Sequence, residues 1–264
     1  MSSNYQKLLN NLEALNLKHM REYVPNYIEI ANRDELSVTE ALLELTNQEL
    51  DFQTNQTVER VIQRAHFPKR TSLEEFDFNF QPSVNKKEIL DLKHMAFMEK
   101  KENLVFIGNP GVGKTHLVIA LGIEACHQGY RTLFISCHEL LLRLRSAFEK
   151  GTVDRVLKRY AKYDLLIIDE IGYLPIQKVE ANLFFQLLTM RYEKKSTMIT
   201  TNIILSRWGE LFQNSEIAAA ILDRLVHHVK VFKITGKSYR MKGKIMGSKK
   251  MTKIKNLNFF ILCL

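Results

Sequence analysis

An octapeptide rich in glycine, GNPGVGKT at residues 108–115, constrains the fold of this chain more than any other stretch. It fits the pattern G-x-x-x-x-G-K-[ST] in full, and it stands between a strand-like apolar run and a helical segment, as that pattern requires. Backbone N–H groups of such a loop point inward around phosphate oxygens, and the following helix N-terminus adds partial positive charge. The octapeptide therefore predicts a nucleotide-binding site.

Each residue type in the octapeptide follows from the chemistry of a nucleotide. The glycines let the backbone fold closely around phosphates. Lys114 is expected to place its charge on the β- and γ-phosphates, and Thr115 to place a hydroxyl on Mg²⁺. ATP and Mg²⁺ are therefore the expected cofactors. The expected nucleotide contacts are Gly108, Asn109, Pro110, Gly111, Val112, Gly113, Lys114, Thr115 and His116.

From residue 103 onward, short apolar strands alternate with helical segments. The expected strands cover residues 104–108, 131–136, 165–169, 197–202 and 229–234. This alternation is typical of a parallel sheet with helices on both faces. The sequence thus predicts an α/β fold, with a five-stranded nucleotide-binding core over residues 103–240.

Two adjacent carboxylates, Asp169 and Glu170, follow the apolar run of the third strand. Because that strand is expected to end beside the phosphate loop, Asp169 is predicted to hold the water shell of Mg²⁺. Glu170 is predicted to orient or deprotonate a water near the γ-phosphate. The alternative is a solvated strand end. A second carboxylate that polarises water favours hydrolysis over transfer of phosphate to a small molecule.

Two more polar residues fit hydrolysis. Asn202 ends the fourth strand and could hydrogen-bond the γ-phosphate or the attacking water, although a turn-forming asparagine is the alternative. Arg224 lies on an expected helix and could reach the nucleotide of a neighbouring subunit, although an ion pair with Asp223 or a plain surface position is the alternative. The candidate catalytic residues are Glu170, Asn202 and Arg224, and the candidate metal ligands are Thr115 and Asp169.

Basic residues gather in the insertion between the second and third strands. Four of them recur at i, i+3, i+4 and i+7, which places them on one face of a helix. Such a stripe fits a phosphate backbone, read without sequence preference, and a solvated outer face is the alternative. Arg143 and Arg145 just upstream add slightly to the DNA interpretation. The stripe comprises Arg155, Lys158, Arg159 and Lys162.

The residues before the core predict a small helical domain and a linker. Residues 1–68 are expected to form a partner-docking domain of four helices, with Pro25 as a possible kink in the second. Ser37 and Glu40 fit a capping box that opens the third helix, and the fourth is expected at about 58–66. Residues 69–102 are expected to be a linker and a leading helix. Its phenylalanines, which either pack on the core or line an adenine pocket, are Phe76, Phe78 and Phe80.

Composition sets further bounds. The net charge of +9 falls to +3 without residues 241–264, which hold six lysines and no acid, so global basicity alone is weak evidence for DNA. That tail is expected to be disordered. No apolar span or leader peptide is evident, and the cysteines show no metal or disulfide spacing, so a cytoplasmic protein without membrane contact is expected.

Taken as a set, the motifs GNPGVGKTHL, LLIIDEIGYLP, ITTN, ILDRLVHH and GKSYR resemble the IstB/DnaC-like branch of AAA+ ATPases. The resemblance is greatest to the IstB helper ATPases of IS21-type transposons, and it is close over about residues 70–242. It implies an AAA+ core, ATP-dependent self-assembly on duplex DNA, and partnership with a DDE transposase. It also implies that residues 138–162 line a DNA channel.

The same resemblance implies roles for single residues. Only about thirty residues follow residue 234, too few for the three-helix lid of typical AAA+ proteins, so a lid-type role for Arg240 is not expected. The implied roles are Walker A for Lys114 and Thr115, Walker B for Asp169 and Glu170, sensor 1 for Asn202, and arginine finger for Arg224.

Three other functions remain open at this point. A replicative helicase loader would share the same core and differ in the partner of residues 1–67. An ATP-gated adaptor would bind nucleotide and scarcely hydrolyse it, which Glu170 argues against. A small-molecule kinase would need an acceptor site, and the sequence shows none.

Overall fold

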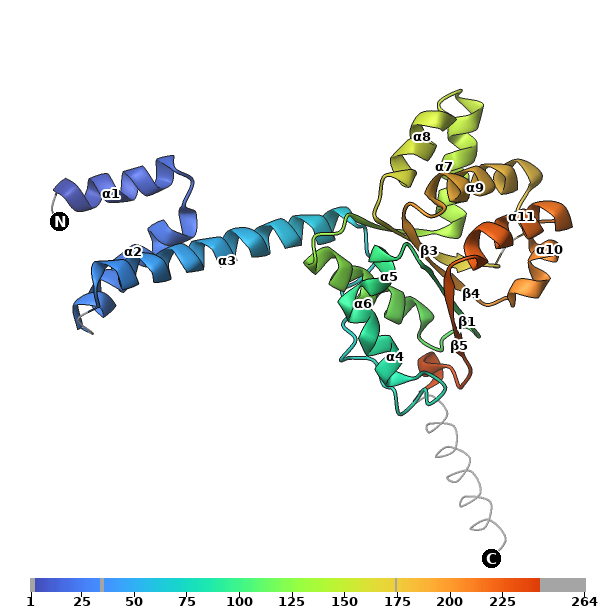
Figure 1. The fold of residues 1–264 in the computed structure, drawn as a ribbon, viewed down its shortest axis with the longest axis horizontal. Helices are drawn as coiled ribbons and strands as arrows, with labels where there is room; N and C mark the ends of the chain where they lie inside the picture. The colour runs from blue at the N-terminus through green and yellow to red at the C-terminus, as the bar shows by residue number, and fades with distance from the viewer. Residues whose placement is uncertain (1–2, 34–35, 174, 243–264) are drawn as a thin grey trace, which may run out of the picture. The chain divides into compact units, whose positions relative to one another are not determined.

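A computed structural model of the chain describes residues 3–33, 36–173 and 175–242, coloured along the chain in Figure 1. These residues fall into two compact units that divide between Val61 and Ile62. The tail expected to be disordered lies outside the described residues from position 243 onward.

The first unit is helical. It contains α1 (Ser3–Ala14), α2 (Lys18–Arg33), which has Pro25 in its interior, and most of α3 (Val38–Arg64). The predicted capping box is confirmed, because the Ser37 amide donates to Glu40 Oε2 at 2.9 Å and the Glu40 amide donates to Ser37 Oγ at 3.3 Å. The small core comprises Leu12, Met20, Val24, Tyr27 and Leu45.

The prediction of a separate fourth helix at 58–66 is wrong. The 27 residues of α3 form one helix. The sequence contains no glycine or proline from residue 38 to residue 64, so nothing in that stretch interrupts the backbone hydrogen bonds.

The second unit is built on a five-stranded sheet in the order β2-β3-β4-β1-β5, in which every neighbouring pair is parallel. All five predicted strands are confirmed. In the sheet, β4 lies between β1 and β3, so the third strand is not the direct neighbour of the strand that leads into the phosphate loop. The strands are β1 (Asn103–Gly108), β2 (Thr132–Ser136), β3 (Leu165–Ile171), β4 (Ser196–Thr201) and β5 (Val229–Ile234).

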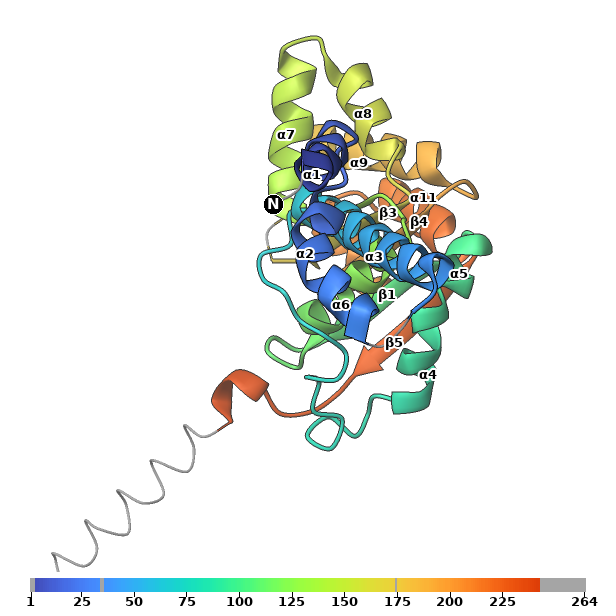
Figure 2. The same ribbon diagram turned by 90° about the vertical axis from the view of Figure 1, so that its left-hand side faces the viewer.

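Helices cover both faces of this sheet (Figures 1 and 2). The flanking elements, in chain order, are α4 (Lys86–Asp91), the 3-10 turn η1 (Leu92–His94), α5 (Ala96–Glu99), α6 (Lys114–His127), α7 (Cys137–Glu149), α8 (Val153–Ala161), α9 (Lys178–Arg191), η2 (Leu205–Arg207), α10 (Trp208–Leu211), α11 (Ser215–Val226) and η3 (Tyr239–Met241).

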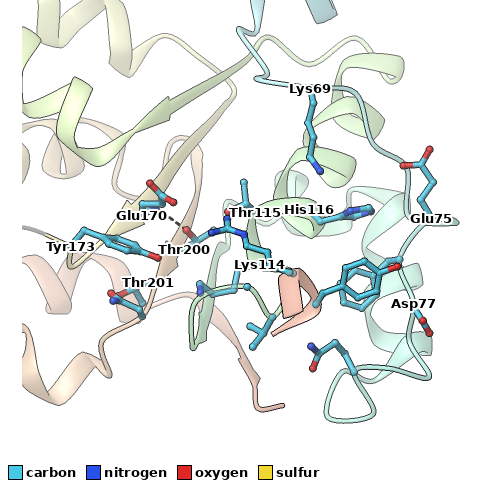
Figure 3. A pocket seen from close by; sticks show the side chains of 18 residues that line it. Lys69, Glu75, Asp77, Lys114, Thr115, His116, Glu170, Tyr173, Thr200 and Thr201 are labelled. Atoms are coloured by element: carbon cyan, nitrogen blue, oxygen red, sulfur yellow. Dashed lines mark hydrogen bonds between the residues drawn. The ribbon is translucent and has the colours of Figure 1, made fainter. Parts of the chain in front are cut away.

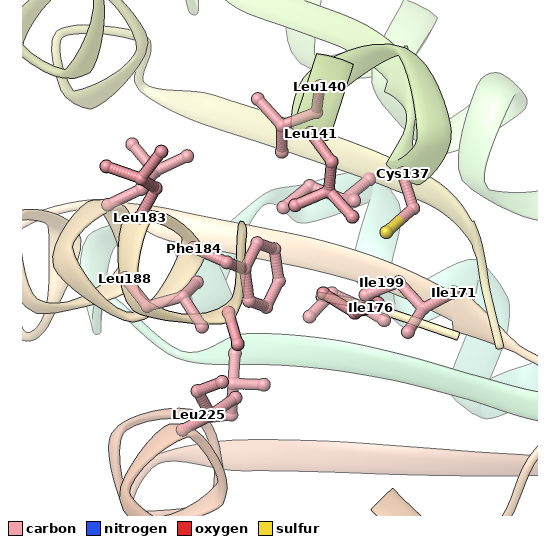
Figure 4. Close-up of a cluster of buried hydrophobic side chains, with 14 of the residues drawn as sticks. Cys137, Leu140, Leu141, Ile171, Ile176, Leu183, Phe184, Leu188, Ile199 and Leu225 are labelled. Atoms are coloured by element: carbon pink, nitrogen blue, oxygen red, sulfur yellow. The ribbon is translucent and has the colours of Figure 1, made fainter. Parts of the chain in front are cut away.

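Alternate residues of β3 enter two separate hydrophobic cores. Leu166 and Ile168 pack with α7, α9 and α11, where Phe184 is fully buried (Figure 4). Leu165 and Ile167 pack on the opposite face with α4, α5 and α6. Both faces of a central parallel strand are thus dry, which explains why its sequence is an unbroken apolar run.

One charged side chain, Arg191 at the end of α9, is 1% exposed. Its guanidinium donates to the carbonyls of Tyr160 (3.1 Å) and Tyr163 (2.8 Å) and to the Thr197 hydroxyl (3.1 Å). It also donates to the Ser196 carbonyl. Burial lowers the pKa of Arg191 to about 9. This one side chain therefore joins the end of α8 to the start of β4.

Past β5, the described residues contain only the short turn η3 and end at Lys242. That part of the chain forms no three-helix lid. Among the described helices, none combines the length and the apolar character needed to cross a membrane.

Candidate functional site

The phosphate loop joins β1 to α6, and two of its glycines have backbone conformations that other residues rarely adopt. Gly111 has φ +82° and Gly113 has φ +103°. A β-carbon on Gly113 would lie 2.5 Å from the Phe76 ring, and one on Gly111 would lie 2.1 Å from Ser238 Oγ. Gly113 precedes α6 without a side-chain cap, so the first N–H groups of that helix are suited to an anion.

The side chain of Lys114 folds back onto the phosphate loop. Its Nζ donates to the carbonyls of Gly108 at 2.6 Å and Asn109 at 3.0 Å. Burial lowers the pKa of Lys114, while the charges of Asp169 and Glu170 oppose that shift. The loop thus holds a concentrated positive charge where phosphate oxygens are expected.

Asp169 contacts the phosphate loop across the intervening strand. Thr115 Oγ1 lies 3.1 Å from each carboxylate oxygen of Asp169, and Thr200 on β4 donates a further hydrogen bond to Oδ1. Burial raises the pKa of Asp169, and the two threonine hydroxyls and Lys114 oppose the shift. A hydroxyl and a carboxylate oxygen side by side are the donors that Mg²⁺ prefers, so Thr115 and Asp169 fit the predicted metal site.

Glu170 faces the same cavity because β3 bulges at its end. Between the pairs Ile168–Ile199 and Ile171–Thr201, β3 has one residue more than β4. Within the bulge Glu170 has φ +63° and its amide donates to Thr200 Oγ1 at 2.9 Å. Successive residues of a regular strand point to opposite faces, and the bulge removes that constraint. Figure 3 shows the Glu170 carboxylate near Thr200 and Tyr173.

A cavity of about 210 Å³ lies beside the phosphate loop. Gly111 to His116, Glu170 and Asn202 line it, as predicted from the sequence, whereas Gly108, Asn109 and Pro110 do not. The Asn202 Oδ1 atom is buried without a hydrogen-bond partner among the described residues. This oxygen is therefore available to accept a hydrogen bond from a bound molecule.

Several residues of the cavity wall were not singled out by the sequence. Two of them, Thr200 and Thr201, belong to the polar end of β4 in the motif ITTN, which could have indicated them. Phe76 packs in the core, as one interpretation of its segment predicts, and it also lines the cavity, where an adenine pocket stays a prediction. The unforeseen residues are Lys69, Glu75, Asp77, Gln81, Tyr173, Thr200, Thr201 and Tyr239.

Arg240 reaches the cavity although no lid carries it. The segment after β5 returns to the phosphate loop, where the Tyr239 amide donates to the Gly111 carbonyl at 2.8 Å. The Lys237 carbonyl accepts from Gln81 Nε2 at 2.8 Å. These contacts add a cation to Lys69 and Lys114 in the cavity wall, at a residue for which the short C-terminal region predicted no lid-type role.

Arg224 lies outside this cavity. It borders a small hollow near the start of β1, at the opposite edge of the sheet, with Asn103 and Thr197. Its guanidinium forms an ion pair with Asp223 at 2.6 Å and lies 5.0 Å from the Tyr192 ring centre. The intrachain pair considered from the sequence is therefore present, and any contact with nucleotide would have to involve another copy of the chain.

The predicted basic stripe forms on α8 and the residue that follows it. Its members are all exposed, and Leu157 and Tyr160 are buried on the opposite face. Among the described residues, Arg155, Lys158 and Lys162 form no ion pair. Figure 2 shows α8 beside α7. The basic members border one shallow hollow together with Asp154: Arg155, Lys158, Arg159 and Lys162.

Arg143 and Arg145 differ from the stripe because carboxylates pair with both. Arg143 binds Glu139, and Arg145 binds Glu149 at 3.1 Å. Arg145 also donates to Gln177 at 2.7 Å. Their charges are thus partly neutralised within the chain, so they contribute less to a basic surface than the sequence alone indicates.

Comparison with known proteins identifies the family. The model for the IstB-like ATP binding protein family matches residues 10–247. The chain belongs to this family. This family member is 48% identical over 242 residues to a protein of Bacillus thuringiensis subsp. berliner named as an ATP-binding protein of insertion sequence IS232, covering 92% of this chain and 97% of that protein. It is 41% identical to the protein so named for IS21 of Pseudomonas aeruginosa, covering 88% of each.

Solved structures agree on the fold of this IstB-like chain. The crystal structure of the DnaC helicase loader matches with a TM-score of 0.50 and 26% identity, over 56% of this chain and 87% of that one. The DnaI structure matches with a TM-score of 0.53 and 22% identity, over 68% and 92%. These matches confirm the predicted AAA+ type of α/β core.

Proposed function

We propose that this IstB-like protein hydrolyses ATP in the presence of Mg²⁺, assembles on duplex DNA and assists a transposase. The observation that carries hydrolysis is the bulged end of β3. It places Asp169 against Thr115 of the phosphate loop and lets the neighbouring Glu170 face the cavity. A site for binding alone would need only the first of these carboxylates.

Each residue then has a step to perform. Lys114 and the loop N–H groups bind the β- and γ-phosphates. Thr115 and Asp169 would hold Mg²⁺, which would supply charge neutralisation at the phosphate oxygens. Glu170 accepts a proton from, or orients, the attacking water. Asn202 positions that water or the γ-phosphate with its amide.

An arginine from a second copy of the chain would complete the site. Arg224 is the candidate, because it lies at the edge of the sheet opposite the phosphate-loop cavity of its own chain. Where such arginines operate, they raise the rate by a factor of about 10³–10⁵. Assembly on DNA would then bring each Arg224 to its neighbour and increase hydrolysis.

The unpaired basic stripe on α8 supports contact with DNA. Charges that track phosphates give binding with little sequence preference. The relatives named for insertion sequences support a transposase as the partner. The similarity to DnaC favours a second candidate, a helicase loader, in which the N-terminal helices would bind a helicase.

Steady-state ATP hydrolysis by the full chain tests the proposal, measured alone, with duplex DNA and with single-stranded DNA. Lys114→Ala is the blank. Stimulation by duplex supports assembly along DNA and the transposition role. Stimulation by single strands alone favours the helicase loader. If neither DNA stimulates, the stripe on α8 is a solvated face and the DNA part of the proposal fails.

A further inference from the structure

Three metal-ligating side chains gather at the edge of the sheet opposite the cavity. Glu193 lies in the turn between α9 and β4, and His227 and His228 join α11 to β5. Each offers one ligand atom, and these atoms all lie within 4.8 Å of one another. We propose that Glu193, His227 and His228 bind one divalent transition-metal ion of the zinc type.

The distances fit one shared ion after small side-chain rotations. Glu193 Oε1 lies 3.6 Å from His227 Nδ1 and 3.8 Å from His228 Nε2. Ligand atoms at ~2.0–2.2 Å from a tetrahedral zinc ion are ~3.3–3.5 Å apart. The three side chains are about half exposed, so water has access to the remaining coordination position.

The two histidines approach the glutamate from different directions although they are adjacent in sequence. His227 caps the end of α11, whereas the His228 carbonyl accepts from the Asn103 amide at the base of β1. Their ring centres are 4.4 Å apart and their planes are at 81°. Rings at this angle can each present a nitrogen to one point.

The backbone of Glu193 is also unusual. Its φ is +55°, a left-handed conformation that costs a residue with a β-carbon about 1 kcal/mol and that favours glycine or asparagine. Here the conformation follows the end of α9 and brings a carboxylate to the histidines. The Glu193 carboxylate lies within 4 Å of one nitrogen of each of these two imidazoles. A shared metal ion explains why a glutamate occupies this position.

The ligand set distinguishes this site from the one at the phosphate loop. Imidazole nitrogens with one carboxylate suit zinc, copper, nickel and cobalt, whereas Mg²⁺ and Ca²⁺ prefer oxygen alone. An ion held here would tie the end of α11 to the turn before β4. It would stand close to Tyr192, whose ring centre is 5.8 Å from that of His227.

Calorimetric titration of the full chain with zinc chloride, without nucleotide or Mg²⁺, tests the site. The variants are His228→Gln and Glu193→Gln, with His94→Gln as the control, since His94 is an exposed imidazole on η1. We expect wild type and His94→Gln to bind one equivalent of zinc that the two site variants lose or bind at least tenfold more weakly. An excess of Mg²⁺ should not displace it.

Two further readouts separate loss of ligands from loss of folding. Circular dichroism must be the same for all four proteins, and zinc should raise the unfolding temperature of wild type and His94→Gln only. Zinc X-ray absorption should show nitrogen and oxygen ligands that include two imidazoles. Equal zinc binding by wild type and by either well-folded site variant overturns the proposal, because zinc bound elsewhere on the chain is the same in all four.

Discussion

The Thr200 hydroxyl on β4 donates a hydrogen bond to the Asp169 carboxylate on β3. The oxygen of that hydroxyl also accepts a hydrogen bond from the Glu170 amide at 2.9 Å. One side chain therefore positions both residues of the acidic pair. Asp169 is held against Thr115, and the bulge that aims Glu170 into the cavity is fastened to the neighbouring strand. The threonine is part of the support of the site, in the way that outer partners orient metal ligands.

Replacing Thr200 by valine should therefore slow ATP hydrolysis by about 10–100-fold, the usual effect of losing an outer partner, with nucleotide affinity changed little. Turnover and fluorescent-nucleotide binding measure the two effects. Thr189→Val is the matched control, since that hydroxyl donates to the Phe185 carbonyl within α9. Equal turnover by wild type and Thr200→Val would show that the bulge holds its shape without this hydroxyl.

Glu170→Gln should retain ATP binding and lose hydrolysis by about 10²–10⁴-fold, because an amide cannot accept the proton from water. A quench assay of phosphate release together with equilibrium ATP binding checks this. Glu210→Gln serves as control, because Glu210 is an exposed partner of Arg207. Unchanged turnover in Glu170→Gln would support the ATP-gated adaptor instead of the hydrolase.

On α8, Lys158→Ala and Arg155→Ala should each weaken duplex binding equally for unrelated sequences. Each should also reduce the slope of log affinity against log salt by about 0.9, the effect of one phosphate contact. Fluorescence anisotropy across a salt series measures both. The control is Arg207→Ala, whose charge is paired. Identical slopes for all variants would assign the stripe to a solvated surface.

Asp169→Asn should stabilise the nucleotide-free protein, raising its unfolding temperature by about 2–4 °C, the shift that about 1 kcal/mol produces in a domain of this size. The reason is that burial raises the pKa of Asp169, so its charged form is less favourable in the fold than in the unfolded chain. Thermal unfolding followed by circular dichroism is the measurement, with the exposed Asp91→Asn as control.

The stability gained by Asp169→Asn should depend on pH, and the raised pKa of Asp169 fixes the direction of that dependence. Below the pKa of an unfolded aspartate, about 3.9, both states hold the proton and the cost is absent. Between that value and the raised folded pKa, the native state holds more protons, so stability falls as pH rises. The advantage of Asp169→Asn should thus grow from about pH 4 upward. An advantage that is largest in acid would contradict this account.

The strands β1 and β3 could be predicted because they are buried on both faces and therefore contain continuous apolar runs. The phosphate loop and the acidic pair could be predicted because their chemistry fixes residue types at short spacing. Thr200 could not, because its role depends on which strand lies beside β3. The strand order β3-β4-β1 comes from packing and is not written in any one segment.

Two other features lay beyond a local pattern. Arg240 reaches the cavity because a backbone hydrogen bond from Tyr239 to Gly111 returns its segment to the loop, more than a hundred residues away in sequence. The helix α3 passes through a polar stretch that offered no apolar period to follow, and its continuity comes from the lack of any breaker. Long-range contact and absence of interruption are both weak signals in a single sequence.

The guanidinium of Arg191 has a mechanical consequence. It holds carbonyls from the end of α8 and from the start of β4, and the far end of β4 carries Thr200. Moving α8 away from the sheet would leave a buried cation and several buried carbonyl groups without hydrogen-bond partners, which is energetically costly. The side chain of Arg191 therefore couples α8, which carries the basic stripe, to β4, which carries Thr200 and so supports the acidic pair.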